Sequence, residues 1–429
     1  MVRACKIAAD KTGPIGTTGT PRRGLIIGGG SFVCLAKILP PTVLANAAEA
    51  EGSADSRIIS GSEAIVPVSV ETGEVIVDVS IDGRGPFPLI FDTGAENAVT
   101  PEIAAALGLK TEGTGTVRDS GGGSLSIAFT RVAEVRIGDA EMSDQRFSVL
   151  PLPRHVTDRG NRPAIAGFIG YELLTRFAVR LDYGHSILTL RPGRDFRYEG
   201  KGVRVPLTLA GNTAVVPGAA DGIEGRFVVD TGSTGALTLQ RAFVEDHGLD
   251  ARHPSALRIK SIGAAGPFET ILMRLDRFDI AGSRIDQPAT RYASVGQQGL
   301  PFTDIDGSIG YEILRQFVIT FDYRGGEVWF ERSSAFGTRT GQGGAGFQAV
   351  RMEGGGFGVT TVLPDTAAAA AGLQVGDVIT EVDGLSTVSM NQGEFAERMR
   401  RPVGTLVRLG TVRDGTLRAI VLTLKEVLP

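Results

Sequence analysis

Two aspartates, Asp92 and Asp230, each follow directly on an apolar run that reads as a buried strand, 89–91 and 227–229. A Thr-Gly pair follows each aspartate, and the two motifs lie 138 residues apart. Because burying a lone ionised carboxylate is costly, each aspartate needs a partner. It either accepts backbone hydrogen bonds in a structural turn at a strand end or takes part in acid–base chemistry. The duplication favours chemistry.

The repeat extends well beyond the two motifs. The segment GFIGYELLTRFAVRLDY at 167–183 matches GSIGYEILRQFVITFDY at 307–323. A Val-Pro pair precedes each motif, and a short helical stretch ending in Gly-Leu follows each. The period is too long for a solenoid. It predicts two homologous lobes, 62–200 and 201–332, packed about a pseudo-twofold axis like a fused dimer.

The repeated residues resemble those of the retropepsin-like aspartic proteases. In both lobes Asp-Thr-Gly ends an apolar strand, a Gly-rich hairpin follows, and an Ile-Gly-Tyr-Glu segment comes near the end. The resemblance implies that Asp92 and Asp230 meet at the lobe interface as a catalytic dyad. Such a pair shares one proton, because two adjacent carboxylates do not both ionise cheaply. The implied reaction is peptide-bond hydrolysis. The ionised aspartate takes a proton from a bound water, and the protonated one donates to the developing oxyanion.

The neighbours of the dyad have expected roles. The glycines let the backbone approach the carboxylates and donate N–H bonds to them. By the resemblance, the threonines hydrogen-bond across the interface, and we expect Ser233 to hydrogen-bond Asp230 and favour its ionised form. The residues expected to support the dyad are Thr93, Gly94, Thr231, Gly232 and Ser233.

Each motif is followed by a Gly-rich segment, DSGGGSLS at 119–126 and SIGAAGPF at 261–268. Both are predicted to be hairpin flaps that exclude water from a cleft; the alternative is a solvent-exposed turn without a role. Neither contains the tyrosine typical of pepsin-type flaps, which places the lobes nearer to retropepsins. By the resemblance, Glu96 is expected to hold the substrate backbone. The flap residues expected to bind substrate are Gly122, Gly123, Gly263 and Ala264.

Residues 1–47 resemble an export leader. Arg22 and Arg23 precede a modest apolar stretch, and Ala-Asn-Ala at 45–47 is a cleavage pattern. The paired arginines resemble a twin-arginine signal, which predicts a periplasmic or otherwise extracytoplasmic protein, tethered to the membrane if the leader is retained. Both cysteines lie in the leader, so the cleaved chain has no disulfide and no cysteine metal site. Residues 48–61 read as a linker.

The C-terminal part changes character. Residues 333–346 read as a flexible linker, and 347–429 resemble a bacterial PDZ domain through the stretch GGGFGVTTVLPDTAAAAAGLQVGDVITEVDG at 354–384. The resemblance implies a groove that takes a peptide as an added strand and holds its C-terminal carboxylate. The alternative is a packing module that binds nothing. The residues expected to hold the peptide are Gly356, Phe357, Gly358 and Val359.

The charge, histidine spacing and glycine content of the chain exclude some classes of function and favour one class of fold. A net charge of −4 and scattered basic residues argue against a nucleic-acid partner. The four histidines have no metal-binding spacing and are expected at the surface, and neither a metal nor a cofactor is expected. The 59 glycines and few aromatic residues favour turn-rich β structure.

The sequence thus predicts a mainly β, single-chain, two-lobed aspartic endopeptidase with a C-terminal PDZ domain that recruits peptide or protein substrate or regulates access. The catalytic unit is expected to be monomeric, because one chain supplies both lobes. One rival is a peptide-binding envelope protein whose lobes are a degenerate scaffold. Another is a structural protein that bridges partners through the PDZ domain. Mutually facing Asp92 and Asp230 would favour the enzyme.

Overall fold

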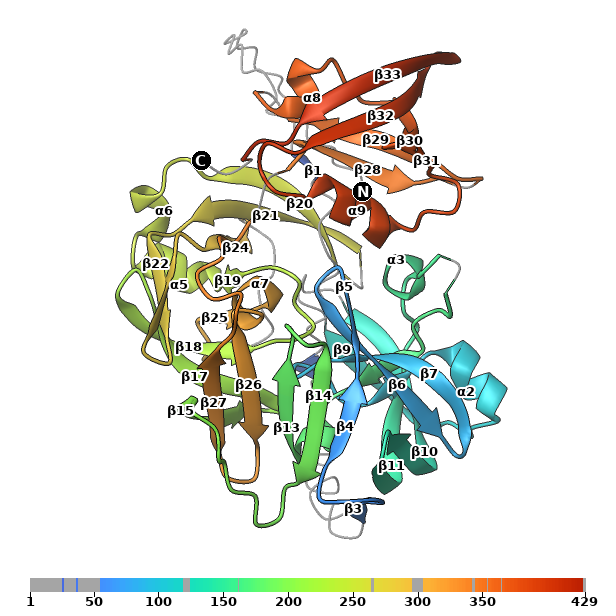
Figure 1. Cartoon of the computed structure of the whole chain (residues 1–429), viewed down its shortest axis with the longest axis vertical. Helices are drawn as coiled ribbons and strands as arrows, with labels where there is room; N and C mark the ends of the chain where they lie inside the picture. The colour runs from blue at the N-terminus through green and yellow to red at the C-terminus, as the bar shows by residue number, and fades with distance from the viewer. Residues whose placement is uncertain are drawn as a thin grey trace, which may run out of the picture.

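The computed structural model describes residues 25–26, 36–37, 55–118, 124–160, 162–263, 266–294, 304–341, 344–352, 354–363 and 365–426. These residues form a mainly β fold of two similar lobes and a smaller C-terminal domain, which confirms the predicted fold class (Figure 1). Within the described residues, no helix combines the length and apolarity that crossing a membrane requires.

Lobe 1 is built on a ten-stranded sheet in which β7 lies between β12 and β6 and ends just before Asp92. The order is β2-β9-β10-β11-β8-β12-β7-β6-β5, with β3 on β11. The elements of this lobe sheet and its helices are β2 (Ala36–Lys37), β3 (Ser56–Ile58), β5 (Ser69–Glu71), β6 (Glu74–Ile81), β7 (Arg84–Phe91), β8 (Ala98–Val99), α2 (Pro101–Leu107), β9 (Glu112–Arg118), β10 (Ser124–Ile137), β11 (Ala140–Val149), α3 (Arg154–Thr157), β12 (Gly167–Ile169) and α4 (Tyr171–Leu174).

Lobe 2 repeats this arrangement in an eleven-stranded sheet, in which β18 lies between β25 and β17 and ends just before Asp230. The order is β1-β20-β21-β24-β19-β25-β18-β17-β22-β23, with β16 on β17. The elements are β1 (Leu25–Ile26), β16 (Thr208–Ala210), β17 (Thr213–Ala220), β18 (Ile223–Val229), β19 (Leu237–Leu239), α5 (Arg241–Asp246), α6 (Leu249–Arg252), β20 (Leu257–Gly263), β21 (Gly266–Arg274), β22 (Arg277–Ile280), β23 (Ser283–Asp286), β24 (Ala289–Ala293), β25 (Gly307–Ile309) and α7 (Tyr311–Leu314).

A six-stranded sheet joins the two lobes in the order β15-β27-β26-β13-β14-β4. At its centre β13 and β26 run antiparallel, with Val179 opposite Phe321 and Leu181 opposite Ile319. These strands come from the matched repeat segments, so the pseudo-twofold axis passes between them. The four side chains are buried in one core shared by both lobes. The strands are β4 (Ala64–Pro67), β13 (Phe177–Asp182), β14 (Ile187–Pro192), β15 (Val203–Pro206), β26 (Phe317–Asp322) and β27 (Glu327–Arg332).

The C-terminal domain has its own hydrophobic core and a six-stranded sheet in the order β28-β29-β30-β32-β33, with β31 on β30. Helix α9 begins with a capping box, in which Asn391 and Glu394 bond each other's backbone N–H groups. Its Phe395 stacks on Phe357 of the sheet at 4.1 Å between ring centroids. The elements are β28 (Phe347–Arg351), β29 (Phe357–Val362), α8 (Ala367–Ala370), β30 (Val378–Val382), β31 (Leu385–Ser386), α9 (Gln392–Met399), β32 (Leu406–Arg413) and β33 (Thr416–Thr423).

This domain sits at one end of the lobe pair, with α9 facing the β5–β6 turn (Figure 1). Thr72 N in that turn donates to Glu397 Oε1 of α9 at 3.1 Å. Arg274 of lobe 2, which is almost fully buried, pairs with Glu426 at 2.9 Å. The C-terminal domain therefore contacts both lobes through polar groups.

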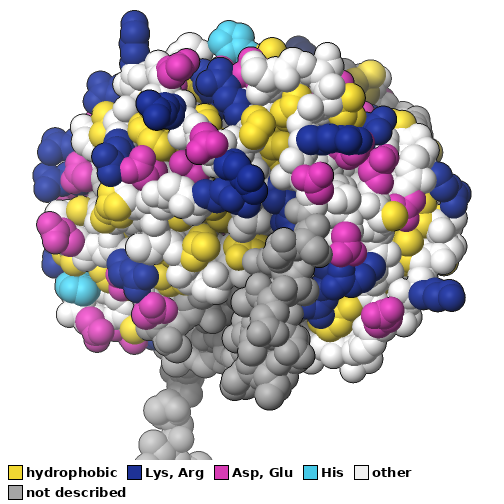
Figure 2. All heavy atoms as spheres, turned by 90° about the horizontal axis from the view of Figure 1, so that it is seen from below, with side chains coloured by type: hydrophobic (Ala, Val, Ile, Leu, Met, Phe, Trp, Pro, Cys, Tyr) yellow, Lys and Arg dark blue, Asp and Glu magenta, His cyan; other side chains and the backbone are white. Residues whose placement is uncertain are grey.

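The face at the opposite end of the molecule carries acidic and basic side chains side by side (Figure 2). In the part of this face that the structure describes, no extended area of a single sign stands out.

Candidate active site

The two Asp-Thr-Gly loops bring Asp92 and Asp230 together at the boundary between the lobes. Asp92 N donates to Ile169 O and Asp230 N donates to Ile309 O, both at 3.0 Å. These bonds extend the parallel pairings β7–β12 and β18–β25 by one residue. Both aspartates are buried, with exposed fractions of 0% and 1%. Each carboxylate is thus positioned by the strand end from which it projects.

The threonines of the two loops exchange hydrogen bonds across the boundary. Thr93 N donates to Thr231 Oγ1 and Thr231 N donates to Thr93 Oγ1, both at 3.0 Å. Each hydroxyl then donates to the opposite strand, Thr93 Oγ1 to Val229 O at 2.6 Å and Thr231 Oγ1 to Phe91 O at 2.8 Å. All of these groups are buried, so breaking the set would leave polar atoms without partners.

The glycines of the motifs contact the carboxylates directly. Gly94 N donates to Asp92 Oδ1 at 2.7 Å, and Gly232 N donates to Asp230 Oδ1 at 3.1 Å. A Cβ atom on Gly232 would lie 2.3 Å from Asp92 Oδ2, which is closer than any non-bonded contact allows. The Asp92 carboxylate therefore lies against the backbone of the lobe 2 loop, and only glycine leaves it that space.

The electrostatics couple the two aspartates. Burial raises the pKa of Asp92 well above its usual range, and the neighbouring Asp230 carboxylate raises it further. The N–H groups of Gly94 and Gly232 act in the opposite direction and lower the same pKa. Asp92 Oδ2 is buried and accepts no hydrogen bond from the described residues. A pair so arranged titrates as a unit, with one proton held between two carboxyl groups at intermediate pH.

Two other predicted site residues lie beside the loops. Ser233 is buried, and its N–H donates to the carbonyl oxygen of Asp230 at 3.2 Å. Glu96 is half-buried and accepts a hydrogen bond from Asn212 Nδ2 of lobe 2. Glu96 is thus held across the lobe boundary. Its predicted contact with the substrate backbone stays a prediction, as does the bond from the Ser233 hydroxyl to Asp230.

The strands on either side of each Gly-rich segment pair antiparallel, β9 with β10 in lobe 1 and β20 with β21 in lobe 2. Val117 and Ile127 of the first hairpin pack in one cluster with Ala95 of the active-site loop, so this hairpin arises next to the dyad. Gly263 pairs with Gly266 at the end of the second hairpin. Gly122, Gly123 and Ala264 lie outside the described residues, so their predicted role in substrate binding stays a prediction.

Two tyrosine pairs near the dyad were missed by the sequence analysis. The rings of Tyr183 and Tyr311 are 5.5 Å apart, and those of Tyr171 and Tyr323 are 6.5 Å apart. Each pair joins one lobe to the other in the same way. Burial raises the pKa of Tyr183 and Tyr323, so both stay uncharged. The sequence signal that could have identified them is their recurrence at matched positions of the repeat.

A buried glutamate, Glu74, was also missed. It is only 8% exposed. Burial, and to a smaller extent the negative charge of Glu71, raise its pKa to about 8. Its carboxyl group raises the pKa of Asp92 in turn, so it lies close to the dyad. The segment ETGE at 71–74 reads as an exposed turn, which hid this residue from a reading of the sequence.

The residues predicted to hold a peptide in the C-terminal domain lie in or next to an inner strand of its sheet. Gly356 precedes β29, and residues 357–359 lie within it. Phe357 and Gly358 pair with β28 on one side and with β30 on the other. Val359 N donates to Asp377 O at 2.8 Å. The predicted location therefore needs correction, because neither edge of β29 is open to an added strand at these residues.

β28 is instead an edge strand of this sheet, with β33 at the other end. The side chain of Gln392, at the start of α9, bridges two backbone groups of β28. Its Nε2 donates to Ala349 O and its Oε1 accepts from Arg351 N, both at 3.0 Å. An extended peptide added to this edge would take over the same two groups.

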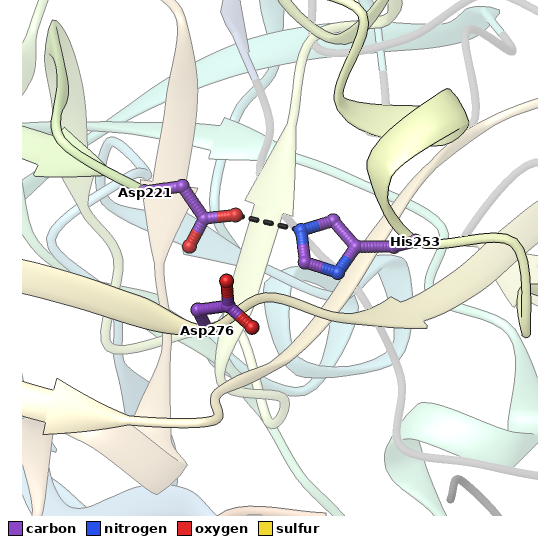
Figure 3. A group of neighbouring side chains, drawn as sticks. All are labelled: Asp221, His253 and Asp276. Carbon is purple, nitrogen blue, oxygen red and sulfur yellow. Dashed lines mark hydrogen bonds and ion pairs between the residues drawn. The ribbon is translucent and has the colours of Figure 1, made fainter.

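A cluster of Asp221, His253 and Asp276 in lobe 2 has the residue types of a metal site, with ligand atoms within 4.8 Å of one another (Figure 3). Internal hydrogen bonds account for its two partly buried members, Asp221 and His253. His253 bonds Asp221 Oδ2 at 2.7 Å, and Asp221 Oδ1 accepts from Arg277 N at 2.9 Å. The His253 side chain is only 11% exposed, so the prediction that places it at the surface is wrong. The cluster fastens the β17–β18 turn to the segment after α6.

Comparison with known proteins agrees with this geometry. A family model described as aspartyl protease matches residues 77–173 and 216–313, one match in each lobe. A model described as PDZ domain matches residues 335–411. No curated protein gave a match. Among solved structures, an aspartic proteinase from Irpex lacteus is similar at a TM-score of 0.43 and 13% identity, over 64% of this chain and 99% of that chain. The assignment of the lobes rests on the family models, because this TM-score is too low to support it.

Proposed function

We propose that this chain, whose two lobes belong to the aspartyl protease family and whose C-terminal domain is a PDZ domain, is an aspartic endopeptidase. It hydrolyses peptide bonds with a water activated between Asp92 and Asp230. The observation that carries the proposal is that two buried, electrostatically coupled aspartates are supplied by equivalent loops of the two lobes. A scaffold that only bound peptides would gain nothing from this arrangement, because it is costly to bury two carboxyl groups together.

The site supports a division of labour between the two aspartates. Asp92 has the raised pKa and an Oδ2 atom that accepts no hydrogen bond from the described residues, so it is suited to hold the shared proton. The ionised partner takes a proton from the water as it attacks the peptide carbonyl, and the protonated aspartate donates to the developing oxyanion. The N–H groups of Gly94 and Gly232 hold the carboxylates in place throughout.

The PDZ domain, in this proposal, recruits an extended peptide and controls access to the cleft. Two contacts support it. β28 is an edge strand of the domain's sheet, and Gln392 of α9 lies on its outer edge. The same helix reaches lobe 1 through the bond between Glu397 and Thr72, in the turn that leads to Glu74. A peptide that displaces Gln392 would therefore act on a helix that touches the protease.

We further propose that residues 1–47 direct export through a twin-arginine pathway to an extracytoplasmic compartment. Arg22 and Arg23 and the Ala-Asn-Ala pattern support this. A reporter fused to residues 1–47 should be exported, and changing both arginines to lysine should stop its export. Export that is indifferent to this change would contradict the proposal.

The enzymatic proposal is tested with residues 48–429. This chain is incubated with a peptide library and an unfolded protein between about pH 3 and 8, the range in which a carboxyl dyad titrates. Internal cleavage that is lost in Asp92→Asn and kept in Asp78→Asn supports it, since Asp78 is an exposed aspartate of β6. Cleavage that survives in Asp92→Asn would contradict it.

A further inference from the structure

Glu74 stands where the β5–β6 turn enters β6, next to the boundary of the lobes. Side chains of β6 alternate between two clusters, and Glu74 shares a face with Ile76. Ile76 packs with Ala95 of the active-site loop and with Val117 of the β9–β10 hairpin. Glu74 therefore faces the side of the sheet on which the dyad and the hairpin lie.

The turn before Glu74 reaches into lobe 2. A Cβ atom on Gly73 would meet the ring of Tyr311 at 2.8 Å and the side chain of Thr234 at 3.3 Å. Thr234 belongs to the active-site loop of lobe 2, four residues after Asp230. The turn thus lies across the lobe boundary, next to the active-site loop of lobe 2.

The carboxyl group of Glu74 has no partner among the described residues. It makes no hydrogen bond and no ion pair there, although its hairpin neighbour Glu71 has both. Glu71 takes the two nearby arginines, bonding Arg159 Nε at 3.0 Å and Arg162 at 2.7 Å. Asp92, whose pKa Glu74 raises, adds a third acidic group. Glu74 is therefore a buried acid near two other acids, and the arginines beside it in the fold are paired with Glu71.

Lobe 2 does not share this feature. Ala210 pairs with Thr213 across the β16–β17 turn, as Glu71 pairs with Glu74 across the β5–β6 turn. Thr213 is the structural equivalent of Glu74 and is buried to 3% exposure. The pseudo-symmetric cleft is therefore asymmetric in charge, with the extra acid in lobe 1. Asymmetry of this kind distinguishes one end of a bound peptide from the other.

We propose that Glu74 is a specificity-determining residue that selects peptides carrying a lysine or arginine side chain beside the scissile bond. The inference rests on the proposed endopeptidase function and names its substrate class. A cationic side chain would supply the charge that Glu74 lacks inside the protein, whereas an acidic one would face Glu74 and Asp92 unpaired.

Binding of such a cation is linked to a proton. With a pKa of about 8, Glu74 is mostly protonated at neutral pH, so pairing with a cation releases a proton. Burial raises this pKa most, and the charge of Glu71 raises it further. The other charged groups around it are the two arginines that pair with Glu71, the Asp92 carboxyl group whose pKa Glu74 raises, and Glu397 of α9, which bonds Thr72. The preference for a basic side chain therefore increases as the pH rises from 6 towards 8.

The test compares peptides that differ at one position, with lysine, its apolar isostere norleucine, or glutamate at each site flanking the cut. For the wild-type chain we expect kcat/KM at pH 8 to be at least about tenfold higher for lysine than for norleucine at one flanking site. Glu74→Gln should bring that ratio close to one. The matched control Asp78→Asn, which removes an exposed carboxylate from the same strand, should keep the ratio.

Equal rates for lysine and norleucine at every flanking site, or a ratio that Glu74→Gln leaves intact, would overturn the inference. Failure of the proposed function is read separately. If no peptide is cleaved, the affinities of the lysine and norleucine peptides for Asp230→Asn are measured by calorimetry. A lysine preference there supports the role of Glu74 without hydrolysis, and equal affinities overturn it.

Discussion

Thr93 of lobe 1 and Thr231 of lobe 2 each accept a hydrogen bond from the other's backbone N–H at 3.0 Å. Both side chains are completely buried, and each hydroxyl also donates to the strand that precedes the other threonine. The two halves of the active site are therefore hydrogen-bonded to each other at the residues that directly follow the two aspartates.

Replacing Thr231 with valine keeps the shape of the side chain and removes the hydroxyl. Thr93 N then loses its acceptor and Phe91 O its donor, both in a buried setting. We expect the free energy of unfolding to fall by about 3 kcal/mol, together with a loss of activity. Urea denaturation measures the first and peptide cleavage the second. Thr231→Ser retains the hydroxyl and should stay close to wild type; a valine variant as stable as the serine variant would contradict this account.

Gly232→Ala tests the close contact between the lobe 2 loop and Asp92. The new methyl group would lie 2.3 Å from Asp92 Oδ2, so the carboxylate must move. A displacement of that size at a reacting group should lower kcat/KM at least about a hundredfold. Gly184→Ala is the control, since its Cβ would meet nothing closer than 3.5 Å. Equal activity of the two variants would show that the contact is unimportant.

The buried carboxyl group of Glu74 makes the free energy of unfolding depend on pH. Its pKa rises from 4.5 when unfolded to about 8 when folded, so between these values the folded state binds more protons than the unfolded state. Its contribution to stability is therefore complete at low pH and is lost as the pH rises through this window, by up to about 1.4 kcal/mol per pH unit.

Glu74→Gln cannot ionise and should remove this dependence. The pKa of Asp92 is also raised by folding, in the wild type and in the variant alike. The effect of Glu74 is therefore the difference between the unfolding free energies of the wild type and the variant. Urea unfolding at pH 5 and pH 8 measures it. The variant should gain stability relative to wild type at pH 8, and a difference that does not change with pH would be inconsistent with a buried, uncharged Glu74.

Gln392→Ala opens the outer edge of β28. The glutamine side chain occupies Ala349 O and Arg351 N, which an added peptide strand needs. Because the peptide no longer has to displace it, peptides with a free C-terminus should bind several-fold more tightly. Fluorescence titration of a tail peptide measures the change. Arg398→Ala, on the same helix, serves as the control, and unchanged affinity in Gln392→Ala would place the peptide elsewhere.

The fold class and the paired aspartates were predictable because the sequence of each lobe contains the same pattern. Asp92 and Asp230 end apolar runs in matched segments, and a repeat at a nearly constant spacing is improbable as a chance match. The four tyrosines of the two pairs also recur at matched positions of the repeat. Each contact joins a tyrosine of one lobe to a tyrosine of the other, and a local sequence pattern does not predict which two tyrosines are in contact.

The location of the peptide-binding edge and the burial of Glu74 depend on strand order and on packing between distant segments. A short sequence motif carries no information about either. The residues 356–359 match a peptide-binding loop in sequence, yet β28 folds back along β29 and takes its outer edge. Glu74 sits in a segment whose residue types are those of an exposed turn. It is buried because the turn lies against Tyr311 of lobe 2 and next to α9 of the PDZ domain.

The most direct test of the shared dyad is a double-mutant cycle on kcat/KM with Asp92→Asn, Asp230→Asn and the double variant. If one water is activated between the two carboxyl groups, each single change should lower kcat/KM by about a thousandfold or more, and the double change should cost little beyond either. A single variant that keeps substantial activity, or losses that multiply in the double variant, would show that the two aspartates act independently and would contradict the mechanism.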